Sequence, residues 1–470
     1  MRADVDRCVA AIARALPDDR VITDRDVCAA HARDESEAEG AMPDAVVRAR
    51  DARDVAVVLR EASAHGVPVT PRGGGTGRTG GAVPVHGGIV IASDRMREVI
   101  AIERVDGIAI VEPGLITGEL HGVLEREGLF WGPDPNSWDA CTIGGNVAEN
   151  AGGPRSFKHG VTRDWVLGLE IVTGDGTILE LGRRTKKGVT GYDLTSLLVG
   201  SEGTLGFVTR AVLRVTPSPE KVITVMAFLD REAAIAPAIA AALDARVTPR
   251  CIELLDDATL AVLRADPGSA AIAIPEAARA LLVIELEGGA ESLDRDLARL
   301  GDALATVSPF DPLVAVEAGE RERFWRVRRE MSRALRRSAR SKLSEDVVVP
   351  RSRIAELIAT CRAIAEQRGI RMPAYGHAGD GNLHVNLLWD RDEQEANVHA
   401  AIRDLFEATI ALGGTLSGEH GIGVLKAPYL SIEQSPELIA LQRRVKSQFD
   451  PRGVLNPGKI FVADPPHRGC

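Results

Sequence analysis

Cysteines are few in this sequence, and none of them belongs to a closely spaced pair. The 470 residues include six cysteines, which stand singly at positions 8, 28, 141, 251, 361 and 470. Because no C-x-x-C pair is present, the sequence argues against a disulfide framework, a zinc ribbon and an iron–sulfur site. This cysteine usage indicates a reducing cytoplasm as the location of the protein.

The sequence also lacks an excess of positive charge and long apolar runs. It has 57 basic and 67 acidic residues, which give a formal net charge of −10. This balance argues against a nucleic-acid-binding protein, which would carry an excess of positive charge. Residues 1–19 carry charges throughout, so we expect neither a signal peptide nor a transmembrane segment. Any membrane association would then come through a partner. The length exceeds what one core supports, which predicts two or more domains.

The N-terminal part alternates between helical and strand-like patterns. Apolar residues at helical spacing in residues 5–16 predict a peripheral helix that ends at Pro17. Residues 45–47 and 67–71 read as strands, and residues 55–65 read as a helix that ends at Gly66. This order predicts an α/β arrangement at the start of the chain.

Residues 72–81 form the most glycine-dense stretch of the protein, with six glycines among ten residues. Residues 75–80 match the dinucleotide pattern G-x-G-x-x-G, but a proline and paired glycines follow where that fingerprint needs a helix. We therefore reject the fingerprint. A loop with successive backbone N–H groups can still bind a pyrophosphate, because glycines allow the phosphate to approach closely. The alternative is that these glycines only form a tight turn and bind no ligand. A second glycine cluster, at residues 141–153, suggests that two loops grip one large cofactor.

The middle of the chain repeats the order strand, helix, strand. Residues 222–228, 231–245 and 250–255 form the first set, and residues 281–286, 291–305 and 312–316 form the second. Two such units in tandem predict a split, ferredoxin-like sheet with helices on one face. We expect this part to be a cap domain.

Two short glycine-rich loops near the C-terminus bring histidines and a carboxylate together. His377 and His384 lie seven positions apart, and Glu419 and His420 follow as a pair. Imidazole and carboxylate are the ligands of a divalent transition metal with open positions, and one spare histidine is a candidate general base. The alternation in residues 383–389 places His384 and Asn386 on one face of a strand, with His377 on the preceding loop. The alternative is that these loops merely expose polar side chains.

An arginine-rich stretch at residues 321–329 could hold the carboxylate of a substrate. Arginine binds a planar carboxylate through paired hydrogen bonds. The competing interpretation is a solvated helix face, which is the usual place for helical arginines.

Seven motifs in a fixed order give the sequence a resemblance to a known family. The chain resembles the FAD-dependent D-2-hydroxy-acid dehydrogenases, namely the D-lactate, D-2-hydroxyglutarate and glycolate dehydrogenase-like members of the vanillyl-alcohol-oxidase flavoprotein superfamily. The resemblance spans residues 44–461, and the motifs occupy residues 71–77, 141–146, 191–194, 200–206, 376–384, 418–423 and 455–459.

The resemblance implies an α+β fold with a two-subdomain FAD-binding domain of the PCMH type. Residues 1–217 would form this domain together with the N-terminal helix. Residues 218–430 would form a ferredoxin-like α+β cap domain that carries the metal site and binds substrate. Residues 431–470 would return to the FAD domain.

The resemblance also implies which residues bind the flavin. The pyrophosphate loop contains neither histidine nor cysteine, so we expect FAD to be bound without a covalent link. The implied cofactor-binding residues are Arg72, Gly73, Gly74, Gly75, Thr76, Gly77, Pro133, Asp134, Thr142, Gly145, Asn146, Gly152, Gly160, Glu202, Val208 and Asn456.

By the same resemblance, His377, His384 and Glu419 would bind zinc, iron or manganese, and His420 would be the catalytic base. Arg328 would hold the substrate carboxylate. Further substrate contacts would come from Ser332, Lys342 and Asn382, although the spacing around Lys342 departs from the family pattern.

These residues together predict the oxidation of a D-2-hydroxy acid to the 2-oxo acid. His420 would take the hydroxyl proton, and the C2 hydride would move to flavin N5. The electrons would leave to an electron-transferring flavoprotein, a quinone or an iron–sulfur subunit, and a homodimer is one assembly that remains open. The alternatives are an FAD oxidase that uses oxygen, a non-redox flavoenzyme of the same superfamily, and a metal- or nucleotide-binding module without catalysis.

Overall fold

The computed structural model describes residues 2–266 and 272–462, and the chain divides into two compact units. Unit 1 comprises residues 1–152, 160–218 and 419–470, and unit 2 comprises residues 153–159 and 219–418. The sixth cysteine, Cys470, and the end of the expected C-terminal segment lie outside the described residues. The five described cysteines are buried and free of disulfides. Within the described ranges, no helix combines the length and the apolar character needed to cross a bilayer.

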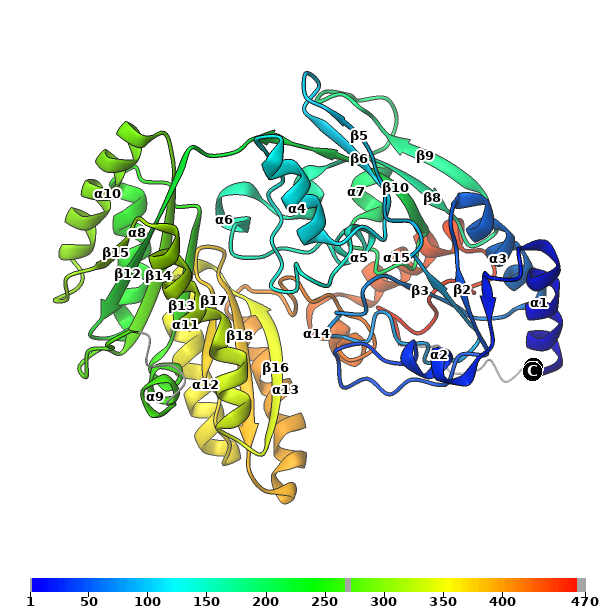
Figure 1. Ribbon diagram of the computed structural model, residues 1–470. Helices are drawn as coiled ribbons and strands as arrows, with labels where there is room; N and C mark the ends of the chain where they lie inside the picture. Colours follow the sequence, from blue (N-terminus) through cyan, green and yellow to red (C-terminus); the bar gives the residue numbers. More distant parts are fainter. Residues whose placement is uncertain (1, 267–271, 463–470) are drawn as a thin grey trace. The chain divides into compact units, whose positions relative to one another are not determined.

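Unit 1 begins with a small sheet covered by helices. The two strands β2 and β3 both run parallel to β4, in the order β1-β2-β4-β3. The α3 helix starts with Asp51, whose side chain accepts two backbone N–H bonds, and ends at Gly66 with a φ of 65°, as the sequence predicts. The elements are α1 (Arg2–Ala15), β1 (Val21–Ile22), α2 (Arg25–Ala30), β2 (Ala45–Arg48), α3 (Ala52–His65), β3 (Val69–Arg72) and β4 (Ile89–Ala92) (Figure 1).

The second part of unit 1 is an antiparallel sheet in the order β5-β6-β10-β8-β9. Strand β10 alternates buried and half-buried residues, as expected for a strand with one core face. Trp131 and Trp165 are the largest side chains of its core. The elements are β5 (Val99–Glu103), β6 (Ile108–Val111), α4 (Thr117–Arg126), β7 (Leu129–Phe130), α5 (Ile143–Glu149), β8 (Val166–Val172), β9 (Ile178–Gly182), α7 (Leu194–Leu198), β10 (Phe207–Arg214), β11 (Thr216–Pro217), α14 (Leu430–Glu433) and α15 (Pro436–Phe449).

Unit 2 is built on one antiparallel sheet in the order β15-β12-β14-β13-β17-β18-β16. The first four strands have the order of the ferredoxin-like split βαβ fold, which confirms the prediction for this region. The strands are β12 (Lys221–Leu229), β13 (Cys251–Leu255), β14 (Ala280–Gly288), β15 (Leu313–Ala315), β16 (Ser341–Val348), β17 (Ala374–His377) and β18 (Asn382–Trp389).

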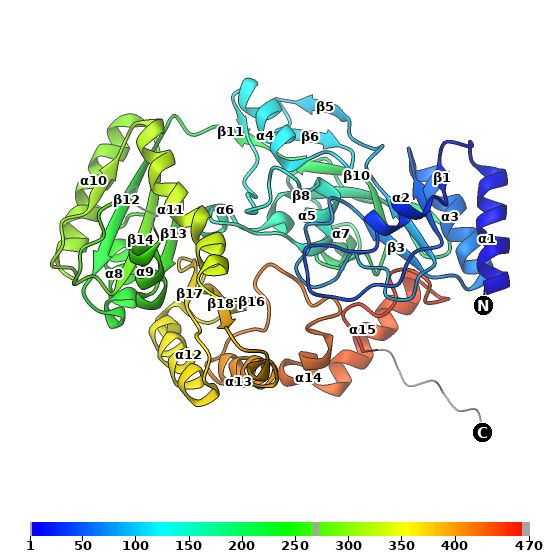
Figure 2. The same ribbon diagram turned by 60° about the horizontal axis from the view of Figure 1, so that its bottom comes forward.

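Helices cover both faces of this sheet, so the prediction of helices on one face was wrong. Helices α9 and α11 contribute to one core with Met226 and Val283, while the neighbours Val225 and Ile284, which point to the other face, are also buried. The nearly continuous apolar runs of β12 and β14 are typical of strands buried on both sides. In both views, α8 and α10 lie side by side against β12 and β14 (Figures 1 and 2). The helices are α6 (Ser156–His159), α8 (Ile235–Asp244), α9 (Asp257–Ala265), α10 (Ala290–Ala305), α11 (Ala318–Arg337), α12 (Ile354–Arg368) and α13 (Glu395–Ala411).

Candidate active site

The glycine-rich segment 72–81 is an irregular connection between the parallel strands β3 and β4. No helix forms before β4 begins at Ile89, which agrees with our rejection of the dinucleotide fingerprint. Gly75 and Gly80 have φ values of 71° and 84°, a left-handed conformation that favours glycine. The segment follows the end of a parallel strand, where the backbone N–H groups of a glycine-rich loop can bind an anion.

The second glycine cluster lies directly against this segment. A Cβ atom added to Gly73 would stand 2.5 Å from Thr142 Oγ1, and one added to Gly74 would stand 2.4 Å from the carbonyl oxygen of Ala140. Thr142 is also the N-cap of α5, because its hydroxyl accepts the N–H of Gly145 at 3.3 Å. The structure thus joins the two loops that the sequence predicted to grip one cofactor, and only glycine fits at their contact.

The C-terminal loop contributes Asn456 to the same region. Asn456 is buried, and its side-chain amide donates to the carbonyl oxygens of Gly81 at 3.0 Å and Glu202 at 2.7 Å. Among the described residues, Asn456 Oδ1 has no hydrogen-bond partner. A buried acceptor that is unsatisfied beside two glycine loops is consistent with a ligand that supplies a donor.

All residues predicted to contact the flavin belong to unit 1, and most of their side chains are at least partly buried. Gly160 has a φ of 76°, and an added Cβ would stand 2.2 Å from Asp164 Oδ2. The carbonyl oxygen of Pro133 lies 3.0 Å from His121 Nε2. Asn146 donates from its side chain to Thr117 Oγ1 at 2.7 Å. The backbone of this region is therefore held by its own polar contacts.

Glu202 was predicted to bind the cofactor, but its carboxylate contacts the loop that follows His420. It accepts the backbone N–H of Ile422 at 2.8 Å and of Gly423 at 2.6 Å. Burial raises the pKa of Glu202, and burial together with the charge of Glu202 raises the pKa of Glu149 well above its usual value.

Thr79, in the glycine-rich segment, binds the other side of the His420 loop. Its hydroxyl donates to the carbonyl oxygen of His420 at 3.0 Å, and its own carbonyl accepts the N–H of Val424 at 2.8 Å. The backbone of His420, the predicted base, is therefore hydrogen-bonded to the glycine-rich segment 72–81, which is predicted to bind the pyrophosphate. Sequence separation of 341 residues hid this contact from pattern analysis.

In unit 2, His377 and His384 lie on adjacent antiparallel strands. Tyr375 is directly opposite His384, and the rings of the two histidines have centroids 5.3 Å apart. His384 lies on a strand as predicted, but His377 is the last residue of β17 rather than part of a loop. Both side chains are mostly buried, so the alternative that these loops simply expose polar groups does not hold for the histidines.

Glu419 directly follows Gly418, the last residue of unit 2. The N–H of Gly418 donates to Asp346 Oδ2 at 2.8 Å, and Asp346 Oδ1 lies 3.9 Å from His384 Nδ1. One atom able to bind a metal from each of His377, His384 and Glu419 lies within 4.8 Å of those of the other two residues. Two imidazoles and one carboxylate at this spacing fit a divalent transition metal with open coordination positions.

The predicted substrate residues lie on α11, β16 and β18. The guanidinium carbon of Arg328 stands 4.6 Å from the centre of the Tyr375 ring, and Arg328 is buried. Lys342 donates to Ser332 Oγ at 3.3 Å. Arg328 is thus not part of a solvated helix face. Asn382 differs from these residues, since its amide donates to Asp346 and to the carbonyl oxygen of Val347, contacts that hold β16 to β18.

Glu253 is the central residue that sequence analysis missed. It lies on β13 with no exposed surface and contacts both His377 and Arg328. Burial acts to raise the pKa of Glu253, but its contacts with His377 and Arg328 outweigh burial and hold that pKa below the usual value. A charged residue between Ile252 and Leu254 in a fully buried strand was the available signal.

Comparisons with known proteins agree with this arrangement. The family described as "FAD binding domain" matches residues 43–182, and the family described as "FAD linked oxidases, C-terminal domain" matches residues 218–460. The glycolate oxidase subunit GlcD of Bacillus subtilis (strain 168) is 41% identical over 434 residues, 90% of each chain. A D-lactate dehydrogenase of Archaeoglobus fulgidus is 35% identical over 421 residues, 88% of this chain and 90% of the relative.

The chain therefore belongs to the family of FAD-linked oxidases. Within it, the protein is an FAD-linked oxidoreductase of the type that includes glycolate, D-lactate and D-2-hydroxyglutarate dehydrogenases. The solved structure of p-cresol methylhydroxylase has a TM-score of 0.82 at 16% identity and covers 98% of both chains. That likeness confirms the predicted PCMH-type fold.

Proposed function

We propose that the protein oxidises a D-2-hydroxy acid to the 2-oxo acid, using non-covalent FAD and a divalent metal bound by His377, His384 and Glu419. The observation that carries this proposal is the cluster in unit 2. Glu253 contacts both Arg328, a buried arginine suited to binding a carboxylate, and His377. His377 in turn lies beside His384, and such a histidine pair is suited to binding a metal. A 2-hydroxy acid presents both a carboxylate and an oxygen ligand on neighbouring carbons.

Arg328 would orient the acid. Its guanidinium is restrained by Tyr375 on one face and by Glu253 at Nε, so the Nη donors present a fixed edge to a carboxylate. Holding the carboxylate also fixes the neighbouring C2 atom, which lowers the entropic cost of reaching the reactive geometry. Ser332 and Lys342 would add a hydroxyl and a positive charge beside the same substrate group.

His420 would take the proton of the 2-hydroxyl group. Its backbone is fixed by Thr79, and the residues after it are fixed by Glu202, which limits the positions that its imidazole can reach. A general base needs such restraint because proton transfer depends on hydrogen-bond geometry.

The two bound groups would supply the remaining chemistry. When bound, FAD accepts a hydride. A divalent metal makes a coordinated hydroxyl more acidic. The loops at residues 72–77 and 142–153, with Asn456, would hold the FAD pyrophosphate. We further propose that the electrons leave to a protein or quinone acceptor.

The experiment is an anaerobic titration of the FAD-loaded protein with D- and L-2-hydroxy acids, followed at the flavin absorbance. Bleaching by D-acids, with slow recovery after air is admitted, supports a dehydrogenase. Rapid recovery with release of peroxide would instead identify an oxidase. If no 2-hydroxy acid bleaches the flavin, the proposed reaction is wrong and a non-redox flavoenzyme becomes the better description.

A further inference from the structure

Glu253 lies where three strands bring polar residues to the same face of the unit 2 sheet. On β13, Leu255 pairs with Tyr375, and Tyr375 in turn pairs with His384. Residues directly opposite each other share a face, and side chains alternate along a strand. Glu253 and His377 therefore point to the face that Tyr375 and His384 also occupy, which α11 covers.

The two oxygens of the Glu253 carboxylate have different partners. His377 Nδ1 lies 2.5 Å from Oε1, and Arg328 Nε donates to Oε2 at 2.6 Å. An ionised carboxylate only accepts hydrogen bonds, so the contact with His377 requires the proton on Nδ1. In that tautomer the nitrogen that can bind a metal is Nε2.

The contact with Arg328 restricts the guanidinium in a similar way. Nε is held by Glu253, and the cation lies over the Tyr375 ring. Both Glu253 and Arg328 are buried, with Glu253 fully removed from solvent. A buried ion pair of this kind is costly to break, because removing one partner leaves an uncompensated charge.

We propose that Glu253 is a positioning residue that aligns the metal-binding nitrogen of His377 and the carboxylate-binding edge of Arg328 at the same time. The inference rests on the proposed function. A carboxylate that accepts from a metal-ligating histidine fixes its tautomer and its ring orientation. Because the same carboxylate holds Arg328, one side chain sets both the metal affinity and the acid affinity of the site.

The test is Glu253→Gln, which keeps the shape of the side chain but leaves only one accepting oxygen. Glutamine can satisfy either His377 or Arg328, and its amide then faces the other donor. We expect at least one of two dissociation constants to rise about 10- to 100-fold. One is that of Zn²⁺, measured by competition with a chromophoric chelator, and the other is that of oxalate, measured from the flavin spectrum.

The matched control is Glu285→Gln on the same face of the sheet. Glu285 is also buried and accepts hydrogen bonds from Thr224 at 3.0 Å and Trp325 at 2.7 Å. We expect this variant to keep both dissociation constants within about twofold of those of the parent. The hydrogen bonds that it weakens are those of Thr224 and Trp325, whereas His377 and Arg328 keep their contacts with Glu253. FAD content, measured from absorbance, should be the same in all three proteins.

Three results would overturn the inference. The first is a Glu253→Gln variant whose affinities for Zn²⁺ and oxalate both match the parent. The second, which does not require a stable variant, is an apo protein in which nitrogen-15 NMR of labelled histidines shows His377 protonated on Nε2. The third is a parent protein that binds no metal, and this result alone would also remove the metal from the proposed function.

Discussion

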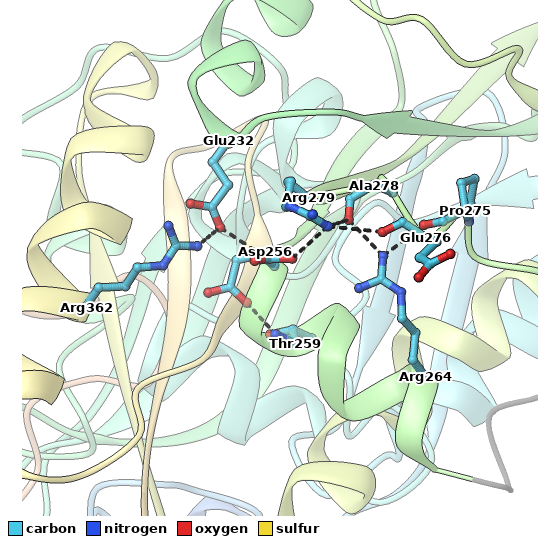
Figure 3. Close-up of polar contacts among 10 residues, drawn as sticks. Glu232, Asp256, Thr259, Arg264, Pro275, Glu276, Ala278, Arg279 and Arg362 are labelled. Carbon is cyan, nitrogen blue, oxygen red and sulfur yellow. Dashed lines mark hydrogen bonds and ion pairs between the residues drawn. The ribbon is translucent and has the colours of Figure 1, made fainter.

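Asp256 gives a prediction about stability that can be worked out from the structure. It follows β13 and caps α9, where one oxygen accepts the N–H of Thr259 at 2.7 Å and the other accepts the N–H of Ala374 at 3.0 Å (Figure 3 shows the contact with Thr259). Burial raises the pKa of Asp256 from 3.8 to about 7, against the effect of its hydrogen bonds, and the negative charge of Glu232 adds to the increase.

The direction of the pH effect follows from proton binding. Between pH 3.8 and about pH 7 the folded protein binds a proton at Asp256 that the unfolded chain has released. The contribution of this proton to stability is therefore complete at low pH and is lost as the pH rises through about 7. The difference between the two pKa values corresponds to about 4 kcal/mol, an upper value for a single buried group.

The perturbation is Asp256→Asn, which resembles the protonated acid in shape and does not titrate. We expect the midpoint of thermal unfolding of the parent to fall, relative to this variant, between pH 5 and pH 8. About two of the roughly three pH units that separate the unfolded and folded pKa values fall in this range, so we expect a loss of about 3 kcal/mol. This corresponds to roughly 6 to 12 °C at about 2 to 4 °C per kcal/mol for a domain of this size. Partial relaxation of the site would make the observed change smaller.

The neighbouring variant Asp257→Asn is the control. The Asp257 side chain is partly exposed and lies 3.9 Å from Arg279, so its replacement should leave the pH dependence of the parent intact. Parallel curves for the parent and Asp256→Asn from pH 5 to pH 8 would refute the reasoning, because they would show that Asp256 has the same pKa in the folded and unfolded states.

Three further predictions concern the cofactor and the reaction. Gly74→Ala should lose FAD, because the added Cβ would stand 2.4 Å from the carbonyl oxygen of Ala140. The flavin absorbance of the purified protein measures this, and a normal FAD content would contradict the proposal that the loop at residues 72–77 binds the cofactor. His420→Ala should retain FAD but lose at least about 100-fold in anaerobic flavin reduction, and reduction at the parental rate would exclude it as the base. Removal of metal with EDTA should abolish reduction and leave FAD bound, with Zn²⁺ or Mn²⁺ restoring activity; full activity in a metal-free protein would exclude a metal role.

The sequence predicted those features that depend on local chemistry. The cap at Gly66, the strand that carries His384, strands β12 to β15 and helices α8 and α10 all follow from spacing and turn residues. Helix α9, which lies between β13 and β14, was not predicted. The coverage of both sheet faces was missed, although the apolar runs of β12 and β14 contained the signal. Periodicity reports how much of a strand is buried, but it does not say which helices bury it.

The sequence could not reveal contacts between distant residues. Glu253 lies 124 positions from His377 and 75 from Arg328, and no local pattern links them. The segment 153–159 is another case, because it lies between the expected flavin residues Gly152 and Gly160 but belongs to unit 2. There His159 Nε2 lies 2.6 Å from Glu287 Oε1. Such contacts depend on the fold as a whole, and only the three-dimensional structure identifies them.

The proposed metal ligand Glu419 and the proposed base His420 are consecutive residues, and the backbone on their two sides is held differently. Before them, the N–H of Gly418 is bound by Asp346, a residue of unit 2. After Glu419, the carbonyl oxygen of His420 is bound by Thr79, a residue of unit 1. These two contacts limit how far the backbone of Glu419 and His420 can move, so both proposed roles depend on the same short stretch of chain.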